Sequence, residues 1–169
     1  MKITIIKGDL TQTKADAIVN EVNPSLAGCG GIDNAICKKA GLGILDELRK
    51  IRKKYPNGLG KGEVIKTKSY NLSKNIKVII HTAVPSFPSD DLSLLRNCYL
   101  NSLKLAEKNK CKTIAFPALS TGIYDLPIET SAKVVKEVLD NYKSGKIQEV
   151  FLVLYYQGHY AAYKRVFGQ

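Results

Sequence analysis

The sequence predicts an α/β protein in which helices cover both faces of a largely parallel sheet. Short apolar runs typical of buried strands recur along the chain, and segments with helical spacing of apolar residues separate them. Strands this apolar, alternating with helices, are typical of parallel sheets. No linker, internal repeat or low-complexity tract interrupts the alternation. We therefore expect residues 1–169 to form one domain.

The first half of the chain is expected to contain four strands and two helices. The strands are expected at residues 2–7, 15–20, 63–67 and 76–83, the last carrying the run Val78-Ile79-Ile80. A helix is expected from about Ile32 to Ala40, closed by Gly41. The next helix should bury one face, made of Ile44, Leu45, Leu48 and Ile51. Residues 56–62 are rich in glycine and are expected to form a loop.

The second half continues the alternation. Asp91 should precede a helix whose inward residues are Leu95, Cys98 or Tyr99, Leu103 and Ala106. Strands are expected at residues 112–117 and 150–154. Between them, residues 128–142 should form a helix with Val135, Val138, Leu139 and Tyr142 on one stripe, and a short helix should end the chain.

Composition narrows the class of protein. Hydrophobic residues make up 44% and charged residues 24%, as in ordinary globular proteins, and the N-terminal residues resemble a strand more than a signal peptide. We therefore expect a cytoplasmic protein without a membrane partner. The formal net charge of +11 favours anionic partners, although the basic run at residues 49–54 is also typical of a solvated helix face. The four cysteines and two histidines show no metal-binding spacing, so no metal or other cofactor is expected.

Two loops contain residues suited to binding an anion. Residues 20–33 follow a strand, carry three glycines within four positions, and open a helix, where backbone amides and the helix dipole favour negative charge. A flexible turn that ends in a helix cap is the alternative interpretation. Residues 118–127 follow another strand and offer the small donors Ser120, Thr121 and Gly122. If the two loops lie at adjacent strand ends, they favour a diphosphate over a single phosphate.

The second loop also comes close to a nucleophile elbow, the sharp turn that carries the serine of many hydrolases. Ala118 stands where that motif requires glycine, and no histidine is clearly placed to serve as the base. A serine hydrolase is therefore disfavoured.

Five blocks follow one another along the chain: Gly8-Asp9-Leu10-Thr11, Asp16–Asn23, Gly28-Cys29-Gly30-Gly31-Ile32-Asp33, Ile80–Pro85 and Phe116–Tyr124. Taken in this order they resemble the macrodomain family, and the similarity spans nearly the whole chain. The MacroD-type group, which includes ADP-ribose hydrolases and O-acetyl-ADP-ribose deacetylases, is the most similar branch. The resemblance implies a three-layer α/β/α sandwich with a mixed central sheet.

The resemblance also implies a role for each matching residue. Asp9 would accept a hydrogen bond from the adenine amino group, with Leu10 beside it, although a turn or cap role is the alternative for Asp9. The amides of Gly30, Gly31 and Ile32 would hold one phosphate. The opposite side of the diphosphate would be wrapped by Ser120, Thr121, Gly122, Ile123 and Tyr124. Tyr124 would also pack on the distal ribose, and Tyr155 or Tyr156 would flank adenine, unless these rings are simply core or rim.

The catalytic residues implied are Asp33 and Asn23. Asn23 would bind the distal ribose, and Asp33 would orient the attacking water, or else would serve only the helix dipole. Asn20 belongs to the expected binding set, chiefly as a brace for the loop.

Three departures from the family pattern weaken the expectation of fast catalysis. Cys37 stands where many members carry histidine, so an orienting contact to Asp33 is expected to be lost. Cys29 replaces a glycine, and Glu21-Val22 replaces two alanines.

Three hypotheses follow. The first is an enzyme that removes mono-ADP-ribose from acidic side chains of proteins or deacetylates O-acetyl-ADP-ribose. The second is a reader that binds ADP-ribose without turnover. The third is a weak nucleic-acid binder that uses the positive charge, for which the chain shows no recognised motif.

Overall fold

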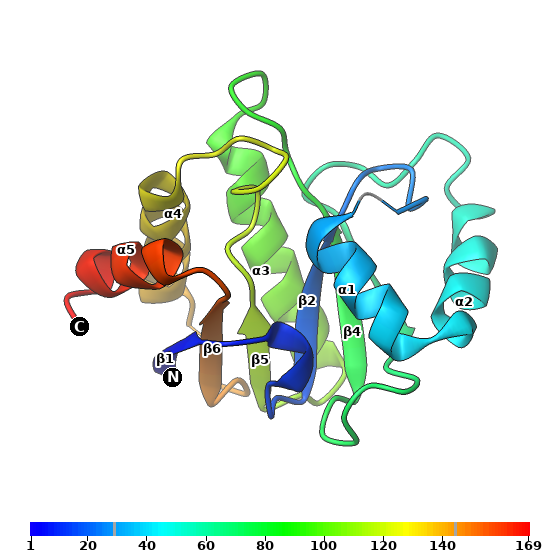
Figure 1. The fold of residues 1–169 in the computed structure, drawn as a ribbon, viewed down its shortest axis with the longest axis horizontal. Coiled ribbons are helices and arrows are strands. Elements are labelled where there is room, and N and C mark those ends of the chain that lie inside the picture. The colour runs from blue at the N-terminus through cyan, green and yellow to red at the C-terminus, as the bar shows by residue number, and fades with distance from the viewer. Residues whose placement is uncertain (29, 144) are drawn as a thin grey trace.

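A computed structural model describes residues 1–28, 30–143 and 145–169 and contains one six-stranded sheet in the order β1-β6-β5-β2-β4-β3 (Figure 1). The neighbouring strands run parallel except β3, which pairs antiparallel with β4. The mixed, largely parallel sheet expected from the sequence is thus confirmed. In spatial order the strands are β1 (Lys2–Lys7), β6 (Glu149–Leu154), β5 (Thr113–Phe116), β2 (Ala17–Val22), β4 (Val78–Ala83) and β3 (Val64–Lys68).

Helices cover both faces of this sheet. Helices α1 (Gly31–Ala40) and α2 (Leu42–Arg52) lie on one face, in front of the sheet in Figure 1. Helix α3 (Leu92–Lys108) lies behind it, together with α4 (Ile128–Asn141). Helix α5 (Gln157–Phe167) packs against α4 and β1. The result is a three-layer α/β/α sandwich.

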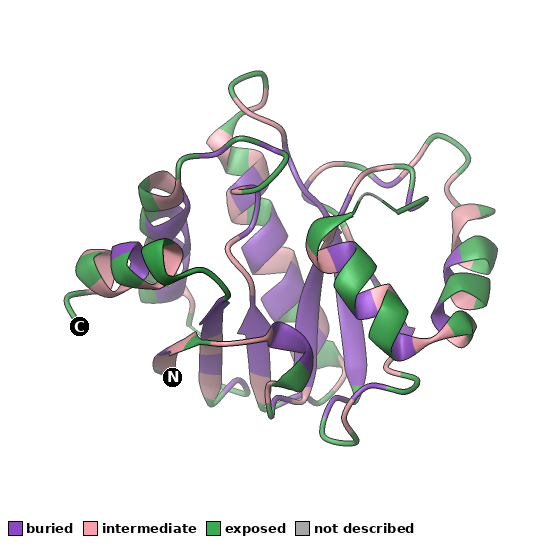
Figure 2. Cartoon of the chain, viewed as in Figure 1, coloured by how far each residue is buried: buried purple, intermediate pink, exposed green. Residues whose placement is uncertain are grey.

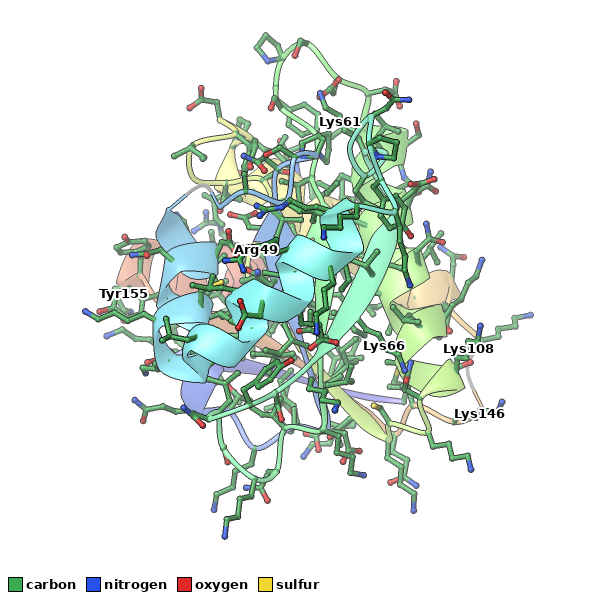
Figure 3. All side chains as sticks on the ribbon, turned by 90° about the vertical axis from the view of Figure 1, so that its right-hand side faces the viewer. Arg49, Lys61, Lys66, Lys108, Lys146 and Tyr155 are labelled. Carbon is green, nitrogen blue, oxygen red and sulfur yellow. The ribbon has the colours of Figure 1, made fainter. Side chains whose placement is uncertain are left out.

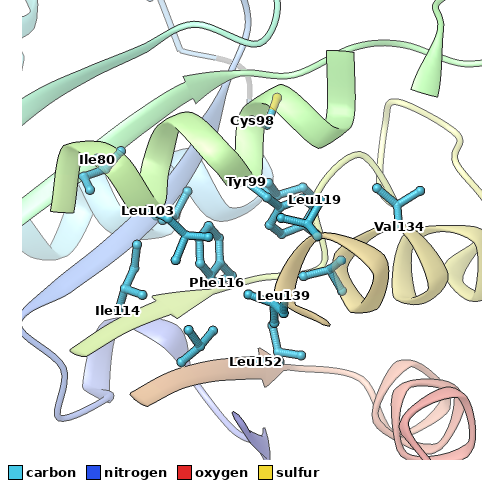
Figure 4. Packing of buried hydrophobic residues seen from close by; sticks show 14 of the residues in the cluster. Ile80, Cys98, Tyr99, Leu103, Ile114, Phe116, Leu119, Val134, Leu139 and Leu152 are labelled. Atoms are coloured by element: carbon cyan, nitrogen blue, oxygen red, sulfur yellow. The ribbon is translucent and has the colours of Figure 1, made fainter. Parts of the chain in front are cut away.

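Each face of the sheet has its own hydrophobic core. On the α3 and α4 side, Tyr99 of α3 lies against Phe116 of β5 with ring centroids 5.1 Å apart, and Leu139 of α4 packs nearby (Figure 4). On the α1 and α2 side, Ile36 and Ile44 are fully buried against the sheet. Figure 2 shows the buried residues concentrated in the strands and in the inward faces of the helices. Burial of this apolar surface, at about 25 cal/mol per Å², is the main stabilising contribution.

The structure corrects some expected boundaries. β2 begins at Ala17 and continues to Val22, because its pairing with β4 extends along the whole of both strands. Leu45, expected to face inward, is 43% exposed, so α2 buries a narrower stripe centred on Ile44 and Leu48. A 3-10 helix, η1 (Leu10–Gln12), was not expected from the sequence.

Two further features are absent from the described residues. Among residues 1–28, 30–143 and 145–169, no helix is long and apolar enough to cross a membrane. In the same part of the chain, no three His, Cys, Asp or Glu side chains lie close enough together to hold a metal ion.

Candidate functional site

The expected binding residues lie along one edge of the sheet. Four parallel neighbours, β1, β6, β5 and β2, end at this edge, and each is followed by one of the segments singled out in the sequence. β1 leads to Asp9, β6 to Tyr155, β5 to residues 117–127, and β2 to the glycine-rich loop. Since adjacent strands are spaced by about 4.8 Å, the row from β1 to β2 spans about 14 Å. This edge therefore suits an extended ligand with several polar groups.

The glycine-rich loop delivers the amino end of α1 to this edge. Gly30 precedes the helix with a φ of 79°, a value that side chains other than glycine rarely adopt, and no side chain caps the helix there. The first amides of a helix have no partner within the helix. A Cβ atom built on Gly30 or Gly31 would meet no atom within 4 Å, so open space lies beside both residues. This is a favourable place for an anion. Cys29, one of the departures from the family pattern, lies outside the described residues.

Asp33 is held by the strand beneath it. Its carboxylate is 4% exposed, and Oδ1 accepts a hydrogen bond of 2.7 Å from Nδ2 of Asn20. Asn20 is fully buried in β2, so it braces Asp33 and offers no exposed surface to a ligand. This agrees with the bracing role expected for Asn20.

A buried histidine extends this chain of hydrogen bonds. Nδ2 of Asn20 lies 3.1 Å from Nδ1 of His81, and Nε2 of His81 lies 2.9 Å from Oγ1 of Thr67. Because an amide nitrogen only donates, Nδ1 of His81 accepts and Nε2 carries the proton. Burial lowers the pKa of His81 to about 3, so the ring stays neutral. The orientation of Asp33 thus depends on two further strands, β4 and β3.

Cys37 keeps the contact that was expected to be lost. One helical turn after Asp33, its Sγ lies 3.6 Å from Oδ1 of Asp33. The expectation that replacing histidine by cysteine removes the contact was therefore wrong, because the i,i+4 spacing on α1 brings even a short side chain close enough. A thiol is nonetheless a weak donor.

Asn23 lies at the start of the glycine-rich loop and holds its shape. Oδ1 of Asn23 accepts a hydrogen bond of 2.7 Å from Ser25, and Nδ2 donates to the carbonyl of Gly28 at 3.4 Å. The side chain is only half-buried. Gly28, which Asn23 contacts, is in turn close to Asp33, since its Cβ position is 3.9 Å from Oδ2 of Asp33.

Ser120, expected to bind phosphate, is committed within the protein. Its side chain is fully buried and donates to the carbonyl of Pro85 at 3.0 Å, while its amide donates to Oε2 of Glu21 at 2.9 Å. The buried hydroxyl also argues against a nucleophilic role. Glu21 is in β2, the strand that precedes the glycine-rich loop. Its contact with Ser120 therefore connects β2 to the second loop, residues 118–127.

The pKa of the Glu21 carboxyl group is well above its ordinary value. Loss of hydration on burial raises its pKa to about 7, and the nearby charge of Asp33 acts in the same direction. The hydrogen bond from the amide of Ser120 opposes both. Glu21 is therefore close to half-ionised at neutral pH.

The remainder of the second loop is more open. Among the described residues, no hydrogen bond is donated by the amides of Gly122 and Ile123, both of which are exposed. Thr121 uses its hydroxyl to cap the carbonyl of Ala118 at 2.8 Å. Tyr124 is only 8% exposed and belongs to the core on the α3 side, so its ring adds little surface to the site. Any anion held by this loop would therefore be bound chiefly by its backbone amides.

At the far end of the row, Asp9 combines a cap with an ion pair. Its carboxylate accepts from the amide of Thr11 at 2.9 Å and from Nζ of Lys39 on α1 at 2.7 Å. Burial alone would raise the pKa of Asp9, but the hydrogen bonds from Lys39 and Thr11 outweigh it and hold the pKa below its usual value. The cap role named as an alternative is therefore present. Asp9 also lines a cavity of ≈ 330 Å³ together with Phe151 and Val153.

The other expected residues at this end differ in accessibility. The side chain of Leu10 is 3% exposed and lies in the core on the α1 side. Tyr155 and Tyr156 are 71% and 64% exposed and meet edge to face at 5.3 Å between ring centroids. These rings form part of the rim beyond β6.

Sequence reasoning missed several residues that the structure adds to the site. They are Thr67, His81, Lys39 and Glu21, whose carboxylate accepts a hydrogen bond from the amide of Ser120. The pairing of His81 with Asn20 follows from the register of β2 and β4, which lie far apart in the sequence. The one available signal was Glu21 itself, a carboxylate at a position where the family pattern has alanine.

Comparisons with known proteins agree with this geometry. The family model described as "Macro domain" matches residues 19–135. A protein of Cronobacter turicensis named O-acetyl-ADP-ribose deacetylase is 34% identical, covering 99% of this chain and 97% of its own. The macrodomain of Oceanobacillus iheyensis with ADP is 35% identical with a TM-score of 0.91, covering 97% of this chain and 88% of that one. The Trypanosoma brucei macrodomain in complex with ADP-ribose is 30% identical with a TM-score of 0.83, covering 98% of this chain and 69% of that one.

Proposed function

Because the chain belongs to the macro domain family, we propose that it binds ADP-ribose along the edge formed by β1, β6, β5 and β2 and hydrolyses groups attached to the distal ribose. The ADP-ribose in the Trypanosoma brucei structure and the name of the Cronobacter relative support this choice of ligand and reaction.

The order of polar groups along the edge supports one orientation of the ligand. Adenine lies at the end with Asp9 and Tyr155, because there a carboxylate is close to aromatic and apolar surface. The diphosphate lies between the amides of Gly30 and Gly31 and the exposed amides of Gly122 and Ile123. The distal ribose then comes next to Asn23 and Asp33. The net charge of +11 favours arrival of such an anion.

The observation that carries the enzymatic proposal is the fixed orientation of Asp33. Its buried carboxylate is held by Asn20 and Cys37 and stands at the amino end of α1. Oδ2 of Asp33 faces Gly28 and is available to hold a water molecule. We expect this water to attack C1″ of the distal ribose, which breaks the C1″–O bond and releases the carboxylic acid of the protein side chain. Alternatively, it attacks the carbonyl carbon of an attached acyl group, which breaks the ester C–O bond and releases the acid and the ribose hydroxyl. Fixed amides around the diphosphate would supply most of the remaining rate enhancement by positioning and charge stabilisation.

Binding is tested first, by calorimetric titration with ADP-ribose. Turnover is then followed on proteins mono-ADP-ribosylated on acidic side chains and on O-acetyl-ADP-ribose. Asp33→Ala is expected to lower the rate about 10²- to 10⁴-fold, as expected for loss of a group that positions a proton or water, while ADP-ribose still binds. Asp140→Ala, which removes an exposed carboxylate of α4, is the matched control and should leave the rate unchanged. An Asp33→Ala variant with full activity would contradict the assignment.

A reader that binds ADP-ribose without turnover is the second candidate, and the contact of Cys37 favours it. A thiol 3.6 Å from Asp33 polarises the carboxylate less than a histidine would. The same turnover experiment separates the two functions. Release no faster than in buffer, combined with tight ADP-ribose binding, supports the reader.

A further inference from the structure

A second cavity lies on the α2 side of Asp33. Its volume is ≈ 440 Å³, and it opens between α1, α2 and the glycine-rich loop. Gly28, Gly30 and Asp33 form one wall, so the cavity begins where the distal ribose is proposed to end. The opposite wall belongs to α2 and includes Arg49 and Arg52. No part of α2 contributes to the proposed diphosphate or adenine contacts.

The α2 wall carries two guanidinium groups that differ in exposure and in hydrogen-bond partners. Arg52 is half-buried and donates from Nη1 to the carbonyl of Leu26 at 3.2 Å, which fixes it against the loop. The side chain of Arg49, which is labelled on α2 in Figure 3, is 64% exposed and pairs with Asp46 at 2.9 Å. An exposed pair of this kind contributes little stability, so Arg49 can exchange Asp46 for another carboxylate at small cost. Guanidinium groups bind carboxylates through two parallel hydrogen bonds.

Apolar groups accompany these charges. Leu48 is 6% exposed and Leu26 is 4% exposed, whereas Leu45 is 43% exposed at the same wall. A cavity that combines cationic and apolar surface suits a polypeptide segment better than a bare phosphate. The aliphatic part of a peptide side chain can contact the leucines, and its carboxylate can pair with an arginine.

We infer that the α2 side of this cavity binds the acidic polypeptide segment to which the distal ribose is attached. The inference rests on the proposed function, since it takes ADP-ribose to lie along the edge with its distal ribose next to Asp33. Any group linked to that ribose must leave the site past Gly28 and Asp33, and the cavity with Arg49 and Arg52 is the space on that path. Recognition of the polypeptide would thus be separate from recognition of the nucleotide.

The test compares ligands and matched variants by calorimetry. The ligands are free ADP-ribose and ADP-ribose joined through a hydrolysis-resistant linkage to either a glutamate-rich peptide or its glutamine-substituted counterpart. We expect the acidic conjugate to bind about tenfold more tightly than free ADP-ribose, as expected for one charge-assisted hydrogen-bonded pair. Arg49→Glu should abolish this preference and leave the affinity for free ADP-ribose unchanged. Lys50→Glu makes the same change of charge at an exposed position that does not line the cavity, and should retain the preference.

The outcomes separate this inference from the proposed function. If free ADP-ribose does not bind, the proposed function fails and the inference fails with it. If ADP-ribose binds but the acidic and glutamine conjugates bind equally, only the inference is overturned. An equal loss in Arg49→Glu and Lys50→Glu would also overturn it, since the effect would then be long-range charge. Preference for an ADP-ribosylated oligonucleotide over the acidic peptide would assign the cavity to nucleic acid instead.

Discussion

At the scale of single residues, the position of Asp33 depends on side chains that the sequence presents in separate blocks. Its place near the amino end of a helix could be predicted, because the glycine run and the helical spacing that follows are local signals. Its orientation could not. Asn20 is 13 residues away and His81 is 61 residues from Asn20, and only the pairing of β2 with β4 brings the three together.

Cys37 gives the first prediction at this scale. Cys37→His should place a stronger donor one turn from Asp33 and raise the turnover number about tenfold, equivalent to about 1.4 kcal/mol. Cys37→Ala removes the contact altogether and should lower the turnover number, with ADP-ribose affinity unchanged in both variants. The measurement is single-turnover release of ADP-ribose. Equal rates in the three proteins would show that the contact to Asp33 does not influence catalysis.

Glu21 gives the second prediction at the scale of single residues. Its carboxylate holds the amide of Ser120 beside the proposed diphosphate, and its pKa is raised to about 7 by burial and by the charge of Asp33. As the pH rises through about 7, Glu21 ionises and repels the ligand, so the ADP-ribose affinity of the natural protein should fall. Glu21→Gln keeps an acceptor for Ser120 without the charge.

The measurement is calorimetry of both proteins at about pH 5.5 and about pH 8.5, below and above the pKa. Glu21→Gln should bind about fivefold more tightly than the natural protein at the higher pH, a difference of about 1 kcal/mol, and nearly equally at the lower pH. A pH-independent difference would show that the charge of Glu21 is not the cause.

At the scale of elements, the strands were predictable as apolar runs, but their order was not. The apolar runs predict buried strands at residues 76–83 and 150–154, but no local pattern indicates that β2 lies between β4 and β5. That order places the two loops proposed to hold the diphosphate at neighbouring strand ends, and it brings Glu21 to Ser120. The predicted end of β2 was also wrong. The apolar run stops before Glu21, but pairing with β4 keeps Glu21 and Val22 extended.

The link from β3 to Asp33 gives a prediction at this scale. Thr67→Val keeps the shape of the side chain but removes the acceptor for the Nε2 proton of His81. A buried donor left without a partner costs about 1–3 kcal/mol, so the free energy of unfolding should fall by that amount in urea denaturation. Thr130→Val, at a half-buried threonine of α4, is the control and should change stability by less than about 0.5 kcal/mol. Equal stability of the two variants would indicate that His81 finds another partner.

At the scale of the whole molecule, Glu21 and His81 give stability opposite dependences on pH. The folded-state pKa of Glu21 is raised from 4.5 to about 7, so the fold binds more protons than the unfolded chain in that interval and Glu21 lowers stability as the pH rises through it. The folded-state pKa of His81 is lowered from 6.5 to about 3, so the unfolded chain binds more protons and stability is lost as the pH falls from about 6.5.

Between about pH 4.5 and 6.5 the two effects oppose each other, so the unfolding free energy of the natural protein should change little from these groups. Glu21→Gln removes one of them. Its stability should therefore rise relative to the natural protein as the pH increases, by about 1–3 kcal/mol at pH 8. Denaturant titrations across this range test the expectation, and parallel curves for the two proteins would contradict it.

The row of parallel strand ends has a consequence for selectivity by size. Asp9 follows β1, and the glycine-rich loop that precedes Asp33 follows β2; these two strands are three strand spacings apart, about 14 Å. If the ligand lies along this row as proposed, a mononucleotide would reach only one end of it and a sugar phosphate only the other. When both halves are joined by their pyrophosphate, the second contact becomes intramolecular and gains from effective concentration. Discrimination against abundant cellular nucleotides would thus arise from the breadth of the sheet itself, without a dedicated gate.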